Sequence, residues 1–115
     1  HRTMAMIQKR PIGGGTGAPI AIAAAATTVH TLDASVAGNG GPYMDEVSLF
    51  VNNVSAGALN VTVVAALGAS IVVALAARTT VQIFVEQPFR LSGGVITCQA
   101  AGADTLVAWG WFTRS

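Results

Sequence analysis

The residues of this sequence that could perform acid–base chemistry are one internal histidine and five carboxylates spread over 115 residues. His30 lies three positions before Asp33, and a histidine that is oriented by a carboxylate can activate a nucleophile. No known nucleophile motif accompanies this pair. We therefore expect His30 on the polar face of a strand, and Asp45 and Glu46 at the solvated start of another strand. The sequence indicates no catalytic residue and no enzyme.

Metal, cofactor and nucleic-acid binding are not indicated either. The single Cys98 and the scattered histidines and carboxylates show no spacing known for a metal site, and we expect Cys98 to be a buried small hydrophobe in a strand. The glycine-rich segment 13–17 lacks the Gly-Lys-Ser/Thr ending of a phosphate-binding loop. The net charge is +1, whereas strong nucleic-acid binders need several clustered cations. The sequence therefore predicts no metal, no cofactor and no nucleic-acid partner.

The strongest local feature is the segment Val-Ala-Trp-Gly-Trp-Phe at positions 107–112. In a strand, Trp109 and Trp111 share one face. The first interpretation is that they fill the core of a domain with few other large side chains. Two alternatives stay open: the centre of a subunit interface, or a stacking platform for carbohydrate to which Tyr43 would contribute. Between the tryptophans, Gly110 would let another backbone approach closely.

The elements that must position these residues are short strands. Turn residues recur every 8 to 12 positions, which is typical of an all-β sandwich or barrel. Alternation predicts shared faces for Val47, Leu49 and Val51, for Leu59, Val61 and Val63, and for Val81, Ile83 and Val85. We expect eight or nine strands, over residues 20–26, 27–32, 46–52, 58–66, 70–76, 79–86, 95–100 and 106–113, with a further edge segment near 89–91.

A long uncharged segment raises the question of a membrane span. Residues 61–77 are almost wholly apolar, and 17 residues is close to the lower limit for a spanning helix. The β-branched residues and the period of two before Gly68-Ala69-Ser70 instead favour two strands around a turn. We therefore predict a strand pair and no membrane insertion.

The N-terminal region has a different composition. Residues 1–18 are polar and then glycine-rich, without apolar periodicity, so we expect a flexible N-terminal arm followed by one β-sandwich domain over 19–115. Within the arm, Lys9, Arg10 and Pro11 are candidate docking residues. Two interpretations stay open for this segment, a free terminus or an arm that docks on a neighbouring subunit.

The composition bears on assembly. Only 10% of residues are charged and 52% are hydrophobic, against about 25% charged in an average domain. Residues 61–64 and 71–73 are apolar on both faces, which suits strands buried on both sides. A second subunit would cover the extra face. The sequence thus predicts a symmetric homo-oligomer, trimer to hexamer, of a jelly-roll-like sandwich.

The residue pattern of the expected β-sandwich domain resembles that of a class of known proteins. EVSLFVNNVSAGALNVTVV, TTVQIFVEQPFRLSGG and VITCQAAGADTLVAWGWF combine short Val/Thr strands, Ala-Gly turns and few charges. Over residues 43–113 the chain resembles small accessory β-proteins of tailed-bacteriophage and gene-transfer-agent particles, such as head-decoration proteins and the bases of head spikes or fibres. The resemblance implies a non-enzymatic virion component, assembled in the host cytoplasm, that attaches to a capsid or tail shell. The rival hypothesis is a carbohydrate- or receptor-binding module that uses Trp109 and Trp111.

Overall fold

The structure, a computed structural model, describes residues 9–13, 17–32, 45–65, 70–89, 94–101 and 106–114. Tyr43, Asp33 and the Gly68-Ala69 turn lie outside the described residues. Within them the chain is all-β, as the sequence predicts. The strands are β1 (Arg10–Pro11), β2 (Ile20–Ile22), β3 (Thr27–Thr31), β4 (Asp45–Asn53), β5 (Leu59–Val64), β6 (Ser70–Leu75), β7 (Thr80–Phe89), β8 (Val95–Ala100) and β9 (Leu106–Arg114).

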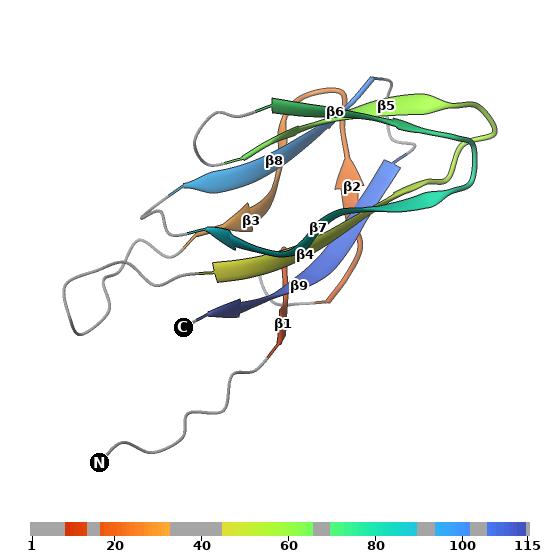
Figure 1. Ribbon diagram of the computed structural model, residues 1–115. Coiled ribbons are helices and arrows are strands. Elements are labelled where there is room, and N and C mark those ends of the chain that lie inside the picture. The colour runs from red at the N-terminus through yellow and green to blue at the C-terminus, as the bar shows by residue number, and fades with distance from the viewer. Residues whose placement is uncertain are drawn as a thin grey trace, which may run out of the picture.

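Two antiparallel sheets stack face to face (Figure 1). The first sheet has the order β1-β9-β4-β7, with β2 also paired to β9, and the second has the order β3-β8-β5-β6. The pairs β2–β9, β3–β8, β4–β7 and β5–β6 are nested, as in one long hairpin whose tip joins β5 to β6. Rolling up that hairpin adds the pairs β4–β9 and β5–β8. This arrangement is a jelly-roll sandwich, and it confirms the predicted fold class.

The core lies between the two sheets and uses the predicted alternation in β4 and β5. Both apolar triplets of those strands face inward, and all but Leu59 are fully buried. Cys98 is buried as expected, and burial raises the pKa of its thiol to about 12. The thiol therefore stays protonated and unreactive at neutral pH. The remaining large core side chains include Ile22, Val29, Leu75, Ile96 and Leu106.

One strand departs from simple alternation. The sequence places Val85 on the same face of β7 as Val81 and Ile83, but in the structure Phe84 is buried and Val85 is 68% exposed. The pairing of β4 with β7 shifts register twice, and each extra residue in a strand sends the following side chains to the other face. Glu86 lies at one of these irregularities and adopts a left-handed φ of 47°.

The long uncharged segment forms the predicted strand pair. β5 and β6 pair in continuous register from Leu59 opposite Leu75 to Val64 opposite Ser70. No helix among the described residues is long and apolar enough to cross a membrane.

A buried asparagine ties this hairpin to the rest of the sandwich. The side-chain amide of Asn53 donates to the carbonyls of Gly57, Leu75 and Ala76, and its Oδ1 accepts from the backbone and hydroxyl of Ser55. Because Asn53 is fully buried, these bonds satisfy an otherwise costly polar group. Asn53 is the last residue of β4, one position beyond the strand end expected from the sequence.

Part of the expected N-terminal arm belongs to the sandwich. Arg10 and Pro11 pair with Phe112 and Trp111 of β9, and Ile12 is buried in the core. β1 and β2 thus lie along the same edge of β9 (Figure 1). The sequence leaves open a free N-terminal arm, whereas in the structure residues 10–12 are held on the sandwich. The reason is Ile12, an apolar side chain in an otherwise polar and glycine-rich segment, which is buried in the core.

Candidate functional site

The two tryptophans lie on the outer face of the first sheet. Along β9, Leu106, Ala108 and Phe112 point into the core, whereas Trp109 and Trp111 point away from it. Trp109 is 37% exposed. The interpretation that the tryptophans fill the core is therefore wrong, because Leu106, Ala108 and Phe112 of the opposite face occupy that space. The predicted sharing of one face by the two indoles is confirmed.

Phe50 of β4 supports this aromatic pair from the neighbouring strand. It lies opposite Trp109 in the β4–β9 register. Their ring centroids are 4.2 Å apart with an interplanar angle of 5°, and the Trp111 ring lies 5.4 Å from the same phenyl ring. Phe50 was not among the predicted site residues. The sequence does contain a pattern that could have identified it. Val47, Leu49 and Val51 form the inward face of the same alternating strand, so Phe50 must lie on the outward face.

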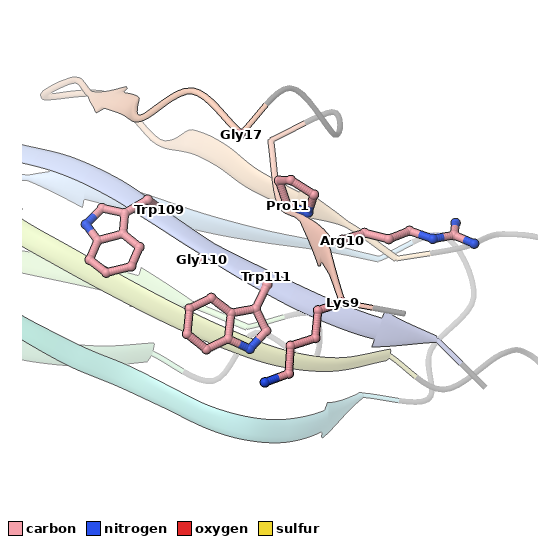
Figure 2. Close-up of a pocket in the computed structure, with 7 residues that line it drawn as sticks. All are labelled: Lys9, Arg10, Pro11, Gly17, Trp109, Gly110 and Trp111. Carbon is pink, nitrogen blue, oxygen red and sulfur yellow. The ribbon is translucent and has the colours of Figure 1, made fainter. Parts of the chain in front are cut away.

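The N-terminal segment completes a pocket around the tryptophans. The pocket is shallow and widely open to solvent, with a volume of about 420 Å³. Lys9 Nζ lies 5.2 Å from the centroid of the Trp111 ring, a cation–π geometry. Figure 2 shows the Arg10 guanidinium turned away from the indoles, whereas the Lys9 side chain runs along Trp111. The lining residues are Lys9, Arg10, Pro11, Gly17, Trp109, Gly110 and Trp111.

The pocket thus unites two sets of residues that the sequence indicates separately. The candidate platform contributes Trp109 and Trp111, and the candidate docking arm contributes Lys9, Arg10 and Pro11. Tyr43, the third aromatic candidate, lies outside the described residues. What joins the two sets is the pairing of β1 with β9.

Trp111 carries an unpaired polar atom. Its Nε1 is buried and has no hydrogen-bond partner among the described residues. In Figure 2 the ring edge with this nitrogen faces the Lys9 side chain. A buried donor without an acceptor is unusual, because most buried polar groups are satisfied.

Gly110 is required between the tryptophans. A Cβ at this position would overlap the carbonyl oxygen of Ser48 and would lie 3.2 Å from Leu49 Cα. The prediction that Gly110 admits a second backbone is confirmed, and that backbone belongs to β4.

A polar cluster of His30, Asp45 and Arg114 lies between the sheets. Two predictions about its residues are wrong. The β3–β8 pairing shifts register between Thr28 and His30, so both Val29 and His30 are buried. The prediction of His30 on a polar strand face is therefore wrong, because a β-bulge breaks the alternation. The prediction of a solvated Asp45 is also wrong, since this residue is 1% exposed.

The polar side chains of this cluster satisfy one another. His30 Nε2 lies 2.7 Å from Asp45 Oδ2, and Arg114 donates from Nε to Oδ1 at 2.6 Å and from Nη2 to Oδ2 at 2.7 Å. The rings of His30 and Phe112 lie 4.5 Å apart, and Arg114 lies 4.9 Å from the centroid of the same phenyl ring. His30 belongs to one sheet, and Asp45 and Arg114 belong to the other. The cluster therefore joins the two layers.

The electrostatics of this cluster assign its protonation at neutral pH. Burial lowers the pKa of His30 below its usual 6.5 and outweighs the opposite effect of Asp45. Burial alone would raise the pKa of Asp45, but the hydrogen bonds from Arg114 and His30 outweigh it and hold the pKa below 3.8. Asp45 is thus ionised and His30 neutral, donating its Nε2 proton. This arrangement holds the two sheets together. The partner of His30 is thus Asp45, whereas Asp33, which the sequence suggests as its partner, lies outside the described residues.

Acidification is expected to destabilise the protein through His30. Between pH 6.5 and the lower pKa of the folded state, the unfolded chain takes up a proton that the folded chain does not, so stability falls as pH falls. One such group gives a slope of at most about 1.4 kcal/mol per pH unit. Urea unfolding between about pH 7.5 and 5.5 measures it. His30→Gln is the control, and an equal slope in that variant would contradict the assignment to His30.

Among the described residues, no group of three or more His, Cys, Asp or Glu side chains could hold a metal ion.

No family model matches the chain, and neither the curated proteins nor the solved structures contain a significant match. The strand topology and the pocket define the class of this protein: a jelly-roll sandwich with an aromatic and basic pocket on one outer face.

Proposed function

We propose that this chain is a non-enzymatic structural protein of a virus or virus-derived particle. It forms a symmetric homo-oligomer, trimer to hexamer, and attaches to a capsid or tail shell as a decoration protein or as the base of a spike or fibre. The jelly roll supports this proposal at the level of the fold, because it is the fold of many viral capsid domains. Since one fold serves many functions, the argument rests on one surface, the edge strand β6.

The edge strand β6 is suited to pair with another chain. Within the described residues it pairs only with β5, so its outer edge presents backbone donors and acceptors. Val72 is 62% exposed and Ile71 is 41% exposed. No charged residue occurs between Glu46 and Arg78. An uncharged, apolar and regular edge is a site of association.

The other edges of the described sheets carry features that prevent such pairing. β7 has two register shifts and contains Glu86 and Pro88. β3 is interrupted by a bulge before His30, and β1 and β2 have two and three residues. Bulges, charges, proline and short length are the usual protections of an edge. β6 lacks all four, which is the observation that carries the proposed self-association. Because two β6 edges paired with each other would close a dimer, a trimer to hexamer requires β6 of one copy to contact a different surface of the next copy.

Val72→Lys is expected to dissociate the homo-oligomer into monomers, because each copy would bring a charge into an apolar contact. Size-exclusion chromatography with light scattering measures the absolute mass at a fixed protein concentration. Val85→Lys is the matched control, since Val85 is an equally exposed valine on the protected edge β7. That variant is expected to keep the wild-type mass.

Two results would contradict this proposal. A monomeric wild-type chain would remove the assembly, and dissociation by Val85→Lys but not by Val72→Lys would place the interface elsewhere. Attachment to a shell is tested separately by immunogold labelling of particles sedimented from the source culture. We expect label on particles that have a capsid or tail, and label confined to the soluble fraction would overturn the attachment.

A further inference from the structure

We propose that the pocket beside Trp109 and Trp111 binds an acidic saccharide, a pyranose ring that carries a carboxylate or a sulfate group. This activity goes beyond assembly through β6. The pocket lies on the outer face of the first sheet, whereas β6 is an edge of the second sheet. The two functions therefore use separate surfaces and can be tested separately.

The aromatic part of the pocket provides a stacking surface. The Trp109 ring is exposed on one side and lies flat against Phe50 on the other. This contact fixes the orientation of the indole before any ligand arrives, which reduces the entropy lost on binding. The apolar C–H face of a pyranose ring can pack against such a surface, and polar groups at the rim then provide orientation and specificity.

The charge of the lining favours an anion. Lys9 and Arg10 are both exposed, and the lining residues include no carboxylate. Only Lys9 is directed at the aromatic pair, since its ammonium lies over the Trp111 ring (Figure 2). An ammonium on a flexible stem can move from an indole face to a carboxylate or sulfate oxygen, and charge-assisted hydrogen bonds are the stronger ones.

The unpaired indole N–H supplies a second polar contact. Trp111 Nε1 is buried without an acceptor, and the Lys9 side chain lies beside it. When Lys9 turns toward a bound anion, this nitrogen becomes accessible to a hydroxyl or acidic oxygen of the same ligand. Binding would then satisfy a donor that the free protein leaves unpaired.

The tryptophan fluorescence of the chain, excited at a wavelength that tyrosine does not absorb, reports on this pocket, because both tryptophans of the sequence line it. The probes are 3′-sialyllactose and 3′-sulfolactose, which share a lactose core and differ in the acidic group, with lactose as the neutral control. We expect a saturable fluorescence change with at least one acidic probe, at an affinity about tenfold above that for lactose. The stronger acidic probe identifies the carboxylate or the sulfate as the preferred group.

A matched pair of variants tests the role of Lys9. Lys9→Met and Arg10→Met each remove one positive charge and keep an apolar stem. We expect Lys9→Met to reduce the affinity for the acidic probe about tenfold and Arg10→Met to change it less than about twofold. Trp109→Ala should abolish binding, with circular dichroism to verify the fold and light scattering to verify the oligomer.

Three results would overturn this proposal. They are no fluorescence change with either acidic probe up to about 10 mM, equal affinity for lactose and the acidic probes, and equal losses in the two methionine variants. If no saccharide binds and Trp109→Ala dissociates the oligomer, the face is a contact between copies of this chain. The Val72→Lys variant separates the two proposals, because it is expected to lose assembly and keep the pocket.

Discussion

Asp45→Ala is expected to lower the free energy of unfolding by about 3–5 kcal/mol, since it removes the carboxylate to which both His30 and Arg114 donate between the sheets. The Asp45 carboxylate accepts from both His30 and Arg114 while being almost fully buried. Without it, the Arg114 guanidinium loses two charge-assisted hydrogen bonds and the buried His30 loses its acceptor. The total stability of a domain is only about 5–15 kcal/mol, so this loss is a large part of it.

Glu46→Ala is the matched control for this prediction. Glu46 is the next residue along β4, but it is only partly buried, and within the described part of the chain its side chain accepts one 3.4 Å hydrogen bond, from Thr113. We expect a loss below about 1 kcal/mol for this variant. Urea unfolding at fixed protein concentration measures both variants. Equal losses in the two variants would show that the buried cluster contributes no more than a surface carboxylate.

Gly110→Ala is expected to destabilise the protein by about 3–5 kcal/mol, or to prevent folding. The added methyl group would overlap the Ser48 carbonyl and would crowd Leu49 Cα, and both are backbone atoms of β4. Backbone in the middle of a sheet cannot move aside as a flexible side chain can. Relief of the overlap would therefore separate β4 from β9 along their nine-residue register.

Gly57→Ala provides the control for backbone substitution. A Cβ at Gly57 meets no atom within 4 Å, so the change in stability should stay within about 0.5 kcal/mol. The comparison uses thermal and urea unfolding of the two variants. A Gly110→Ala variant as stable as Gly57→Ala would contradict the close approach of β4 to β9.

The two proposals have a joint consequence for function. In a symmetric oligomer built through β6, every copy presents its own pocket on the outer face of the first sheet. Linked sites of low affinity can raise the overall affinity by about 10²–10⁴ without any new contact. A weak saccharide site on one chain would then be sufficient for firm attachment of a particle that displays several copies.

Much of the fold could be predicted from local patterns. The period of two and side-chain size account for the alternation in β4, β5 and β9 and for the pairing of β5 with β6. They also account for the buried Cys98 and the close approach at Gly110. Such patterns fail where a strand contains a bulge. The bulge before His30 and the two register shifts opposite β7 each reversed a face, and nothing in the local sequence specifies an extra residue.

The candidate site shows the same division between sequence and structure. The sequence by itself determined that Trp109 and Trp111 share a face, because side chains of a strand alternate. Only the tertiary structure decided that this face is the outer one, that Phe50 lies beneath Trp109 and that Lys9 lies over Trp111. It likewise brought Asp45 to Arg114 across 69 positions. These contacts depend on strand pairing between distant segments, which is selected by the packing of the whole core and by no single segment.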